Sequence, residues 1–287
     1  MSIDDILATS LSLHSHKGGS GKTLVAMNLA AYLVQKGKRV ALIDMDLTAP
    51  SLGTFVTDHE GKTLNDFLLK RATAEEVFFD ATNLIGDDAP GKLFMGLADM
   101  AGEAIAEINQ RDTDAMLEDL FTLMELVRVK LPGDPFNVDY ILIDTSPGLT
   151  TNAINGVAIT DQVIMILRLV NADVDGTYHF LNTLFKSVQP KTSIIVNQIA
   201  DHIINDGGRE KIENLVMSQI VNAIPDLDVT FAGILLTDKE VISNEFNYAM
   251  ASLDKTIKIR RPIHIISKTS QTFAEKFKSV ISGVIDA

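Results

Sequence analysis

One seven-residue loop constrains this chain more than any other part of its 287 residues. The loop is rich in glycine and reads Lys17, Gly18, Gly19, Ser20, Gly21, Lys22 and Thr23. A β-rich stretch at residues 9–14 precedes it, and a helical pattern at 22–35 follows it. Glycine amides in such a unit can surround phosphate oxygens, and the helix N-terminus adds unpaired N–H groups. The loop therefore predicts a phosphate site, with a glycine-rich turn that binds nothing as the alternative.

The polar side chains of the loop have expected roles. Lys22 is expected to reach the β- and γ-phosphates of a nucleotide, and the Thr23 hydroxyl is expected to ligate Mg²⁺. The backbone around Gly18, Gly19, Ser20 and Gly21 is expected to hold the phosphates.

Short apolar runs alternate with helical patterns along the rest of the chain, which is typical of a parallel sheet with helices on both faces. Strands are predicted at 9–14, 39–44, 92–97, 139–144, 162–167, 192–197 and 229–235. Helices are predicted at 22–35, 63–70, 113–130, 174–185, 209–223 and 271–285. We therefore predict a doubly wound α/β fold in a single domain over residues 1–287. Residues 54–137 are interpreted as strand and helix material with insertions, since no linker marks a separate domain.

Composition and charge exclude several classes of protein. Hydrophobic residues make up 46% of the chain, which excludes intrinsic disorder. There is no cysteine, so disulfides, thiolate zinc sites and cysteine-ligated iron–sulfur clusters are excluded. No apolar run approaches the roughly 20 residues of a membrane span, and the first residues lack a signal-peptide pattern, so a cytoplasmic protein is expected. The net charge of −13 opposes indiscriminate nucleic-acid binding.

The loop departs from the general phosphate-loop pattern, because His16 occupies the place of its first glycine and Lys17 opens the loop. This form resembles the deviant Walker A loop of the MinD/ParA class of ATPases, and further motifs follow in the order of that class. The resemblance implies a P-loop NTPase fold, ATP and Mg²⁺ as cofactors, and a homodimer that forms around nucleotide. It also implies that Lys17 reaches the partner's phosphates, with a solvated loop lysine as the alternative.

Three aspartates and a glycine match the motifs of that class. Asp44 ends the predicted second strand, and Asp46 follows it at the place of switch I. The resemblance implies that Asp46 orients the attacking water and that Asp44 supports the metal site. Asp144 ends an apolar strand of Walker B type, which places it beside the metal. Gly148 fits switch II, where its amide can sense the γ-phosphate.

The nucleobase site is predicted from weaker signals. Asn197 follows a strand and resembles the asparagine that hydrogen-bonds adenine in this class, although an asparagine there is often only a turn residue. Pro262 resembles the loop that packs against the base. Leu24 stands where the class has a second hydroxyl residue at the α-phosphate, so a backbone amide is expected to substitute. His16, beside the phosphates, is interpreted as a satisfied structural histidine, with a proton-sensitive contact as the alternative.

These signals predict a Mg²⁺-dependent ATPase, with Lys17, Lys22 and Asp46 as its catalytic residues, that switches an interaction with an unidentified protein partner. The alternatives are a binding module that senses ATP occupancy with little hydrolysis, and a protein that positions itself on DNA or membranes. The cluster at residues 255–261 keeps DNA contact open. The apolar face of the last predicted helix, with Phe273 and Phe277, is expected to face the core rather than a membrane.

Overall fold

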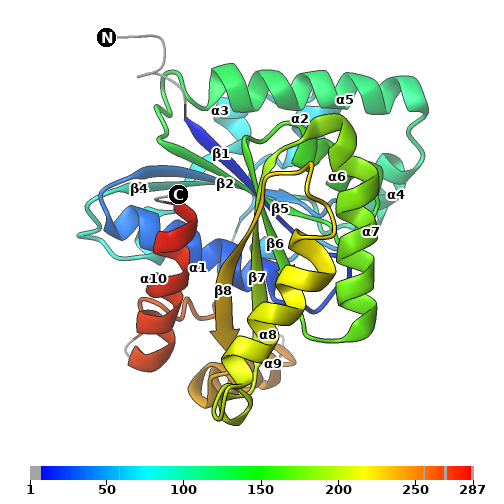
Figure 1. The fold of residues 1–287 in the computed structure, drawn as a ribbon. Helices are drawn as coiled ribbons and strands as arrows, with labels where there is room; N and C mark the ends of the chain where they lie inside the picture. Colours follow the sequence, from blue (N-terminus) through cyan, green and yellow to red (C-terminus); the bar gives the residue numbers. More distant parts are fainter. Residues whose placement is uncertain (1–7, 58, 255, 268–269, 286–287) are drawn as a thin grey trace.

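The computed structural model describes residues 8–57, 59–254, 256–267 and 270–285, apart from the side chains of 184–188 (Figure 1). Within these residues, eight strands form one sheet in the order β3-β4-β2-β5-β1-β6-β7-β8. β3 runs antiparallel to β4, and every other neighbouring pair is parallel. The predicted doubly wound, mostly parallel sheet flanked by helices is confirmed.

The seven predicted strands keep their places to within two residues at each end. They are β1 (Thr9–His14), β2 (Arg39–Met45), β3 (Phe79–Asp80), β4 (Lys92–Gly96), β5 (Tyr140–Thr145), β6 (Gln162–Leu167), β7 (Lys191–Ile199) and β8 (Val229–Leu236). Of these, only the short β3 has no predicted counterpart.

Ten α-helices connect the strands within the described residues. They are α1 (Lys22–Gln35), α2 (Leu64–Leu68), α3 (Ala74–Val77), α4 (Gly102–Asn109), α5 (Thr113–Glu125), α6 (Thr151–Ala158), α7 (Asn171–Val188), α8 (Gly208–Val216), α9 (Lys239–Ser252) and α10 (Gln271–Ile285). The helix predicted at 113–130 is α5 followed by a π-helical turn (Leu126–Lys130), and the helix predicted at 209–223 ends in another (Met217–Val221). Sequence patterns missed α3, α4, α6 and α9.

Both faces of the sheet are covered, which explains its continuously apolar strands. Neighbouring residues of a strand point to opposite faces. Leu42 therefore packs in the core beneath α1 and α10, while Ile43 packs against α2 and α5 on the other face. A third cluster covers the far half of that face, between β6–β8 and helices α7 and α8. The apolar stripe of α10 is buried in the core, as predicted.

One face of β1 is polar because it bonds to neighbouring connections instead of packing against apolar side chains. The Ser10 hydroxyl donates to Asp161 Oδ2 at 2.6 Å, and Ser12 Oγ accepts from the Thr160 hydroxyl at 3.1 Å. His14 Nδ1 lies 2.8 Å from Thr145 Oγ1, and its ring stacks on Phe180 of α7 at 4.2 Å. Burial and the nearby Lys22 charge lower the pKa of His14 to about 3, so the ring is neutral.

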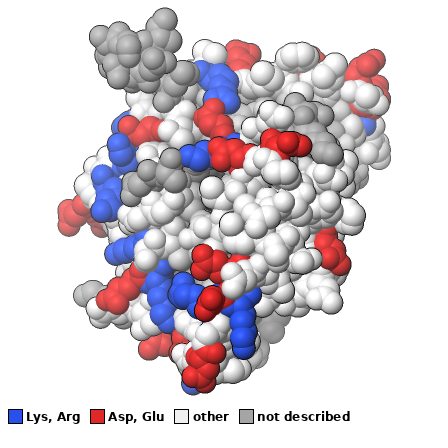
Figure 2. Space-filling view, in the orientation of Figure 1, with Lys and Arg blue, Asp and Glu red and all other residues white. Residues whose placement is uncertain are grey.

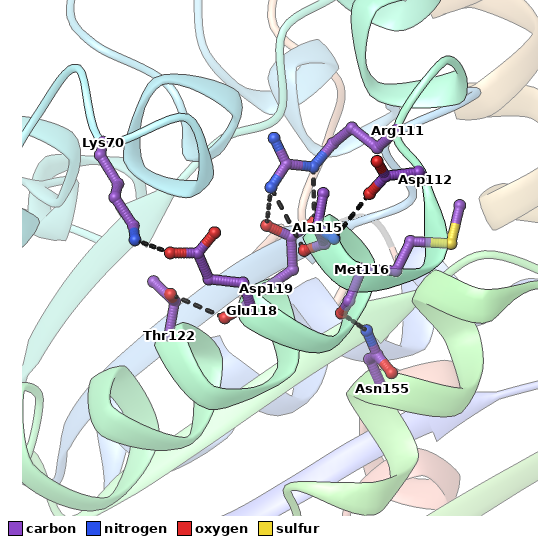
Figure 3. A network of polar contacts seen from close by, with 9 residues as sticks. All are labelled: Lys70, Arg111, Asp112, Ala115, Met116, Glu118, Asp119, Thr122 and Asn155. Atoms are coloured by element: carbon purple, nitrogen blue, oxygen red, sulfur yellow. Dashed lines mark hydrogen bonds and ion pairs between the residues drawn. The ribbon is translucent and has the colours of Figure 1, made fainter.

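Residues 54–137 contribute β3, β4 and the helices α2–α5 to the same sheet and core. Polar contacts fix the start of α5 (Figure 3): Asp112 caps it by accepting from the Ala115 amide at 2.9 Å, and Arg111 pairs with Asp119. Asn155 of α6 reaches the carbonyl of Met116. This interval therefore belongs to the same sheet and core, and the single domain over residues 1–287 stays a prediction.

Lys, Arg, Asp and Glu side chains are interspersed on the face drawn in Figure 2. Lys276 of α10 pairs with Asp201 at 3.2 Å, and Arg261 pairs with Glu245 at 2.8 Å. Lys255 of the predicted basic cluster lies outside the described residues. Within the described part of the chain, every helix is too short or too polar to cross a membrane.

Candidate nucleotide site

The phosphate loop connects the carboxyl end of β1 to the first turn of α1. Gly19 and Gly21 have φ angles of 78° and 92°, in the left-handed region that favours glycine. A Cβ on Gly21 would also lie 2.5 Å from Asn197 Nδ2. Glycine is therefore required at position 21 by both its backbone angle and its neighbour.

Two side chains at the end of β7 donate hydrogen bonds to the backbone of this loop. Asn197 Nδ2 donates to the Ser20 carbonyl at 2.7 Å, and Gln198 Nε2 donates to the Gly19 carbonyl at 3.0 Å. Asn197 thus has a structural contact that sequence reasoning missed. Its predicted bond to adenine stays a prediction; the contact with Ser20 uses one N–H of the amide and leaves the other N–H and the oxygen.

Asp144 lies at the end of β5 beside β1 and is fully buried. Neither of its carboxylate oxygens has a hydrogen-bond partner among the described residues, and the buried Ser20 hydroxyl also lacks one. Burial raises the pKa of Asp144 to about 6, although the Lys22 charge and the nearby Thr23 hydroxyl oppose the shift. A buried carboxylate without a partner is costly unless a ligand compensates it. This donor set fits a nucleotide and a Mg²⁺ ion that keeps most of its water.

Thr23 and Asp44 connect this centre to switch I, defined here as residues 46–55. The Thr23 and Ser51 hydroxyls lie 2.8 Å apart. Asp44 accepts backbone N–H bonds from Asp46, Ser51 and Leu52 at 3.0–3.1 Å. Burial, followed by the Asp144 charge, raises the pKa of Asp44 to about 8. Asp44 therefore anchors switch I, a role that adds to its predicted support of the metal.

Asp46 lies where the loop leaves β2 and is largely buried. Its Oδ1 accepts from the Thr48 hydroxyl and from the Ala49 amide, each at 3.1 Å. The same carboxylate that is predicted to orient water thus also shapes the turn of switch I.

Switch II begins directly after β5. Gly148 has a φ of 76°, and its amide donates to the Ser15 carbonyl at 2.9 Å. The predicted contact with a γ-phosphate requires this bond to break. Ser146 and Thr150, which caps α6, lie 2.5 Å apart, so a movement of switch II reaches α6 directly.

A pocket of about 570 Å³ opens next to Gly19 and Gly21. Its walls include Leu24, Asn197, Asp238, Ile242, Glu245 and Arg261. The predicted base contact Pro262 is half-buried beside this wall and is not among its lining residues. The acidic lining residues were missed because α9 was not predicted.

The two loop lysines differ in exposure. Lys22 is buried, with 8% of its surface exposed, and its charge acts on Asp144. Lys17 is exposed at the rim of the loop, and its predicted contact with a partner's phosphates stays a prediction. Arg168 is a further cation that sequence reasoning missed. It follows β6, pairs with Asp173 at 2.9 Å, and its Nη1 would lie 3.9 Å from a Cβ on Gly19.

His16 packs tightly against α7. A Cβ on Gly176 would lie only 2.0 Å from its ring. Its Nδ1 is buried with no hydrogen-bond partner among the described residues, so the interpretation of a satisfied histidine was wrong. The Cδ2, Cγ and Nε2 atoms of the ring face Gly176, which offers Nδ1 no side-chain partner.

The AAA_31 family model, described as an AAA domain, matches residues 8–199. The chain belongs to this family. An uncharacterized ATP-binding protein of Methanocaldococcus jannaschii is 23% identical over 226 residues, covering 77% of this chain and 75% of that protein. The chromosome-partitioning ATPase Soj of Treponema pallidum is 29% identical over 177 residues, covering 61% of this chain and 62% of Soj.

Among solved structures, the septum site-determining protein MinD of Pyrococcus horikoshii, complexed with Mg-ADP, superposes with a TM-score of 0.67. It is 19% identical, and the match covers 97% of this chain and 96% of that one. The predicted MinD/ParA-type P-loop ATPase family and its fold are therefore confirmed.

Proposed function

We propose that this chain is a Mg²⁺-dependent ATPase, formed as one domain over residues 1–287, that dimerises around ATP and switches a protein interaction. The observation that carries the proposal is the buried Asp144 carboxylate, whose oxygens have no partner at hydrogen-bond geometry among the described residues although it lies beside the phosphate loop and the Lys22 cation. The Mg-ADP in the MinD complex and the partitioning ATPase activity in the Soj name support the same nucleotide and reaction class.

Each polar side chain of the nucleotide site has an expected role. Lys22 binds the β- and γ-phosphates, while Thr23 and Asp144 hold Mg²⁺, directly or through its water, and Asp44 supports them. The bound metal supplies positive charge at the phosphate oxygens. Asp46 orients the attacking water, and its position depends on the bonds that it and Asp44 make within switch I. Hydrolysis would then release switch I and switch II together.

Apolar surface around the site supports dimerisation. Met100, Leu149 and Val170 follow the carboxyl ends of β4, β5 and β6 and are each about half exposed or more. Ile242 and Phe246 of α9 are exposed beside the nucleotide pocket. Exposed apolar side chains gathered on one face indicate a protein interface. The exposed Lys17 on this face would meet the partner's nucleotide and offset repulsion between two acidic chains.

The test uses the Asp46→Ala variant with ATP and Mg²⁺. It is expected to bind ATP normally and to hydrolyse it roughly a hundredfold more slowly, since a water-orienting group acts mainly on the transition state. Static light scattering is expected to show a dimer in the presence of ATP. A variant that stays monomeric would refute the dimer. ATP binding with a turnover that does not respond to this substitution would instead favour the module that senses ATP occupancy.

A further inference from the structure

Arg261 joins three parts of the molecule at the wall of the nucleotide pocket. Its Nε donates to Glu245 Oε2 of α9 at 2.8 Å. The centre of its guanidinium group lies 5.1 Å from the centroid of the Phe55 ring in switch I. Its backbone N–H donates to the carbonyl of Thr54 at 3.0 Å. One residue thus connects the pocket wall to the end of switch I.

Glu245 fixes the direction of this arginine. Its second oxygen, Oε1, lies 2.9 Å from Nε2 of the fully buried His264. Burial alone would raise the pKa of Glu245, but the bond with His264 and the charge of Arg261 hold it below its ordinary value. The ionised carboxylate therefore holds Arg261 from one side, while Phe55 stacks on it from another.

Switch I also connects Arg261 to the metal side of the site. Ser51 contacts Thr23, and the Ser51 and Leu52 amides donate to Asp44. The short helical turn Leu52–Phe55 leads from these contacts to Phe55 and Thr54. Tyr248 of α9 reaches the same Thr54 carbonyl at 3.4 Å. A shift at the pocket wall therefore reaches Thr23 through one continuous set of packed residues.

We propose that Arg261 is a positioning residue that couples occupancy of the nucleobase pocket to the conformation of switch I. A base in the pocket would restrict Arg261 and Glu245, and these in turn restrict Phe55, Thr54 and the turn that carries Ser51. A phosphate ligand without a base would leave these residues unrestricted. This inference rests on the proposed function, because it assumes that the pocket beside Gly21 receives the base.

Hydrogen exchange at the amides of residues 51–57 tests the coupling without using activity. The unmodified chain is compared with Mg-ADP and with Mg-pyrophosphate, each at saturation. We expect Mg-ADP to slow this exchange about tenfold more than Mg-pyrophosphate, because only ADP carries a base. In Phe55→Leu, which removes the ring beneath Arg261, this difference is expected to vanish while ADP affinity changes less than about threefold.

Two further variants complete the test. Arg261→Lys keeps the charge but cannot bond Glu245 and cover Phe55 at once, so it is expected to lose most of the difference and to lower kcat about tenfold with little change in KM. Arg260→Ala is the matched control, because the exposed Arg260 bonds Thr57 Oγ1 at 3.5 Å and does not line the nucleotide pocket among the described residues. It is expected to behave like the unmodified chain.

The outcomes separate the two proposals. If ADP binds and both ligands protect residues 51–57 equally, the coupling is refuted while the ATPase proposal stands. The coupling is also refuted if Phe55→Leu and Arg261→Lys both keep the full difference. If neither ADP nor ATP binds to the unmodified chain, the proposed function fails and the coupling fails with it.

Discussion

Asp119 and Asp144 are both buried carboxylates, but only Asp119 receives hydrogen bonds from the described residues. Asp119 of α5 receives two bonds from Arg111, Nε to Oδ2 at 2.9 Å and Nη2 to Oδ1 at 2.6 Å (Figure 3). Asp144 receives none within the described residues. Folding leaves a buried charge unpaired only where something else compensates it. The α5 region is therefore closed and structural, whereas the carboxyl edge of the sheet is prepared for a ligand.

The largest expected effect concerns the nucleotide site around Asp144. Lys22→Ala removes the buried cation next to Asp144 and is expected to weaken ATP binding by several kcal/mol, on the order of a thousandfold, because phosphate contacts with a charged donor are strong. Calorimetry with Mg-ATP measures it, and Lys92→Ala, which breaks an exposed pair with Asp80, serves as the control. Unchanged affinity would overturn the phosphate-loop assignment.

Breaking the Arg111–Asp119 pair is expected to lower the stability of the fold without changing nucleotide binding. Arg111→Ala leaves Asp119 buried without its partner, and burial already raises the pKa of Asp119 despite Arg111. We expect a loss of about 3 kcal/mol in the free energy of unfolding, with nucleotide affinity unchanged. Urea unfolding and calorimetry measure the two quantities. The comparison would fail if this variant lost nucleotide binding while keeping its stability.

Asp144→Asn alters the buried carboxylate of the nucleotide site. We expect it to change ligand binding rather than the stability of the fold. Without nucleotide, the unfolding temperature should change little, because the cost of burying the Asp144 charge is removed at constant volume while its attraction to Lys22 is lost. The stabilisation that saturating Mg-ADP gives the unmodified chain, about 2–3 kcal/mol at a hundredfold excess over Kd, should be largely lost. A variant that is unstable without ligand would show that Asp144 has a structural partner.

The smallest expected effect compares two exposed lysines, Lys17 in the phosphate loop and Lys70 beside α5. Lys17→Ala should leave ATP binding by the monomer nearly normal and weaken ATP-dependent dimerisation about tenfold, or about 1.4 kcal/mol. Lys70→Ala is the matched control, since Lys70 is also exposed but pairs with Glu118 of its own chain. Light scattering with ATP and Mg²⁺ distinguishes them. Equal dimerisation in both variants would make Lys17 a solvated loop residue.

Local patterns were sufficient for the loop, the strands and the family. The run Lys17–Thr23 can be identified from the sequence because a phosphate cradle needs glycine and lysine at fixed spacing within one turn. Strands β2, β5 and β6 can be identified because burial on both faces demands continuous apolar residues. The buried stripe of α10 can be identified from its helical period.

Only the tertiary structure decided which distant residues meet at the site. α9 buries none of its residues, so its apolar positions carry no core pattern, yet it places Glu245 at the pocket wall. The bonds of Asn197 to the loop, of Gly148 to Ser15 and of Arg261 to Thr54 join segments far apart in sequence. Such contacts depend on the register and order of the strands. A sequence pattern specifies what one segment prefers, whereas packing the sheet determines which segments lie side by side.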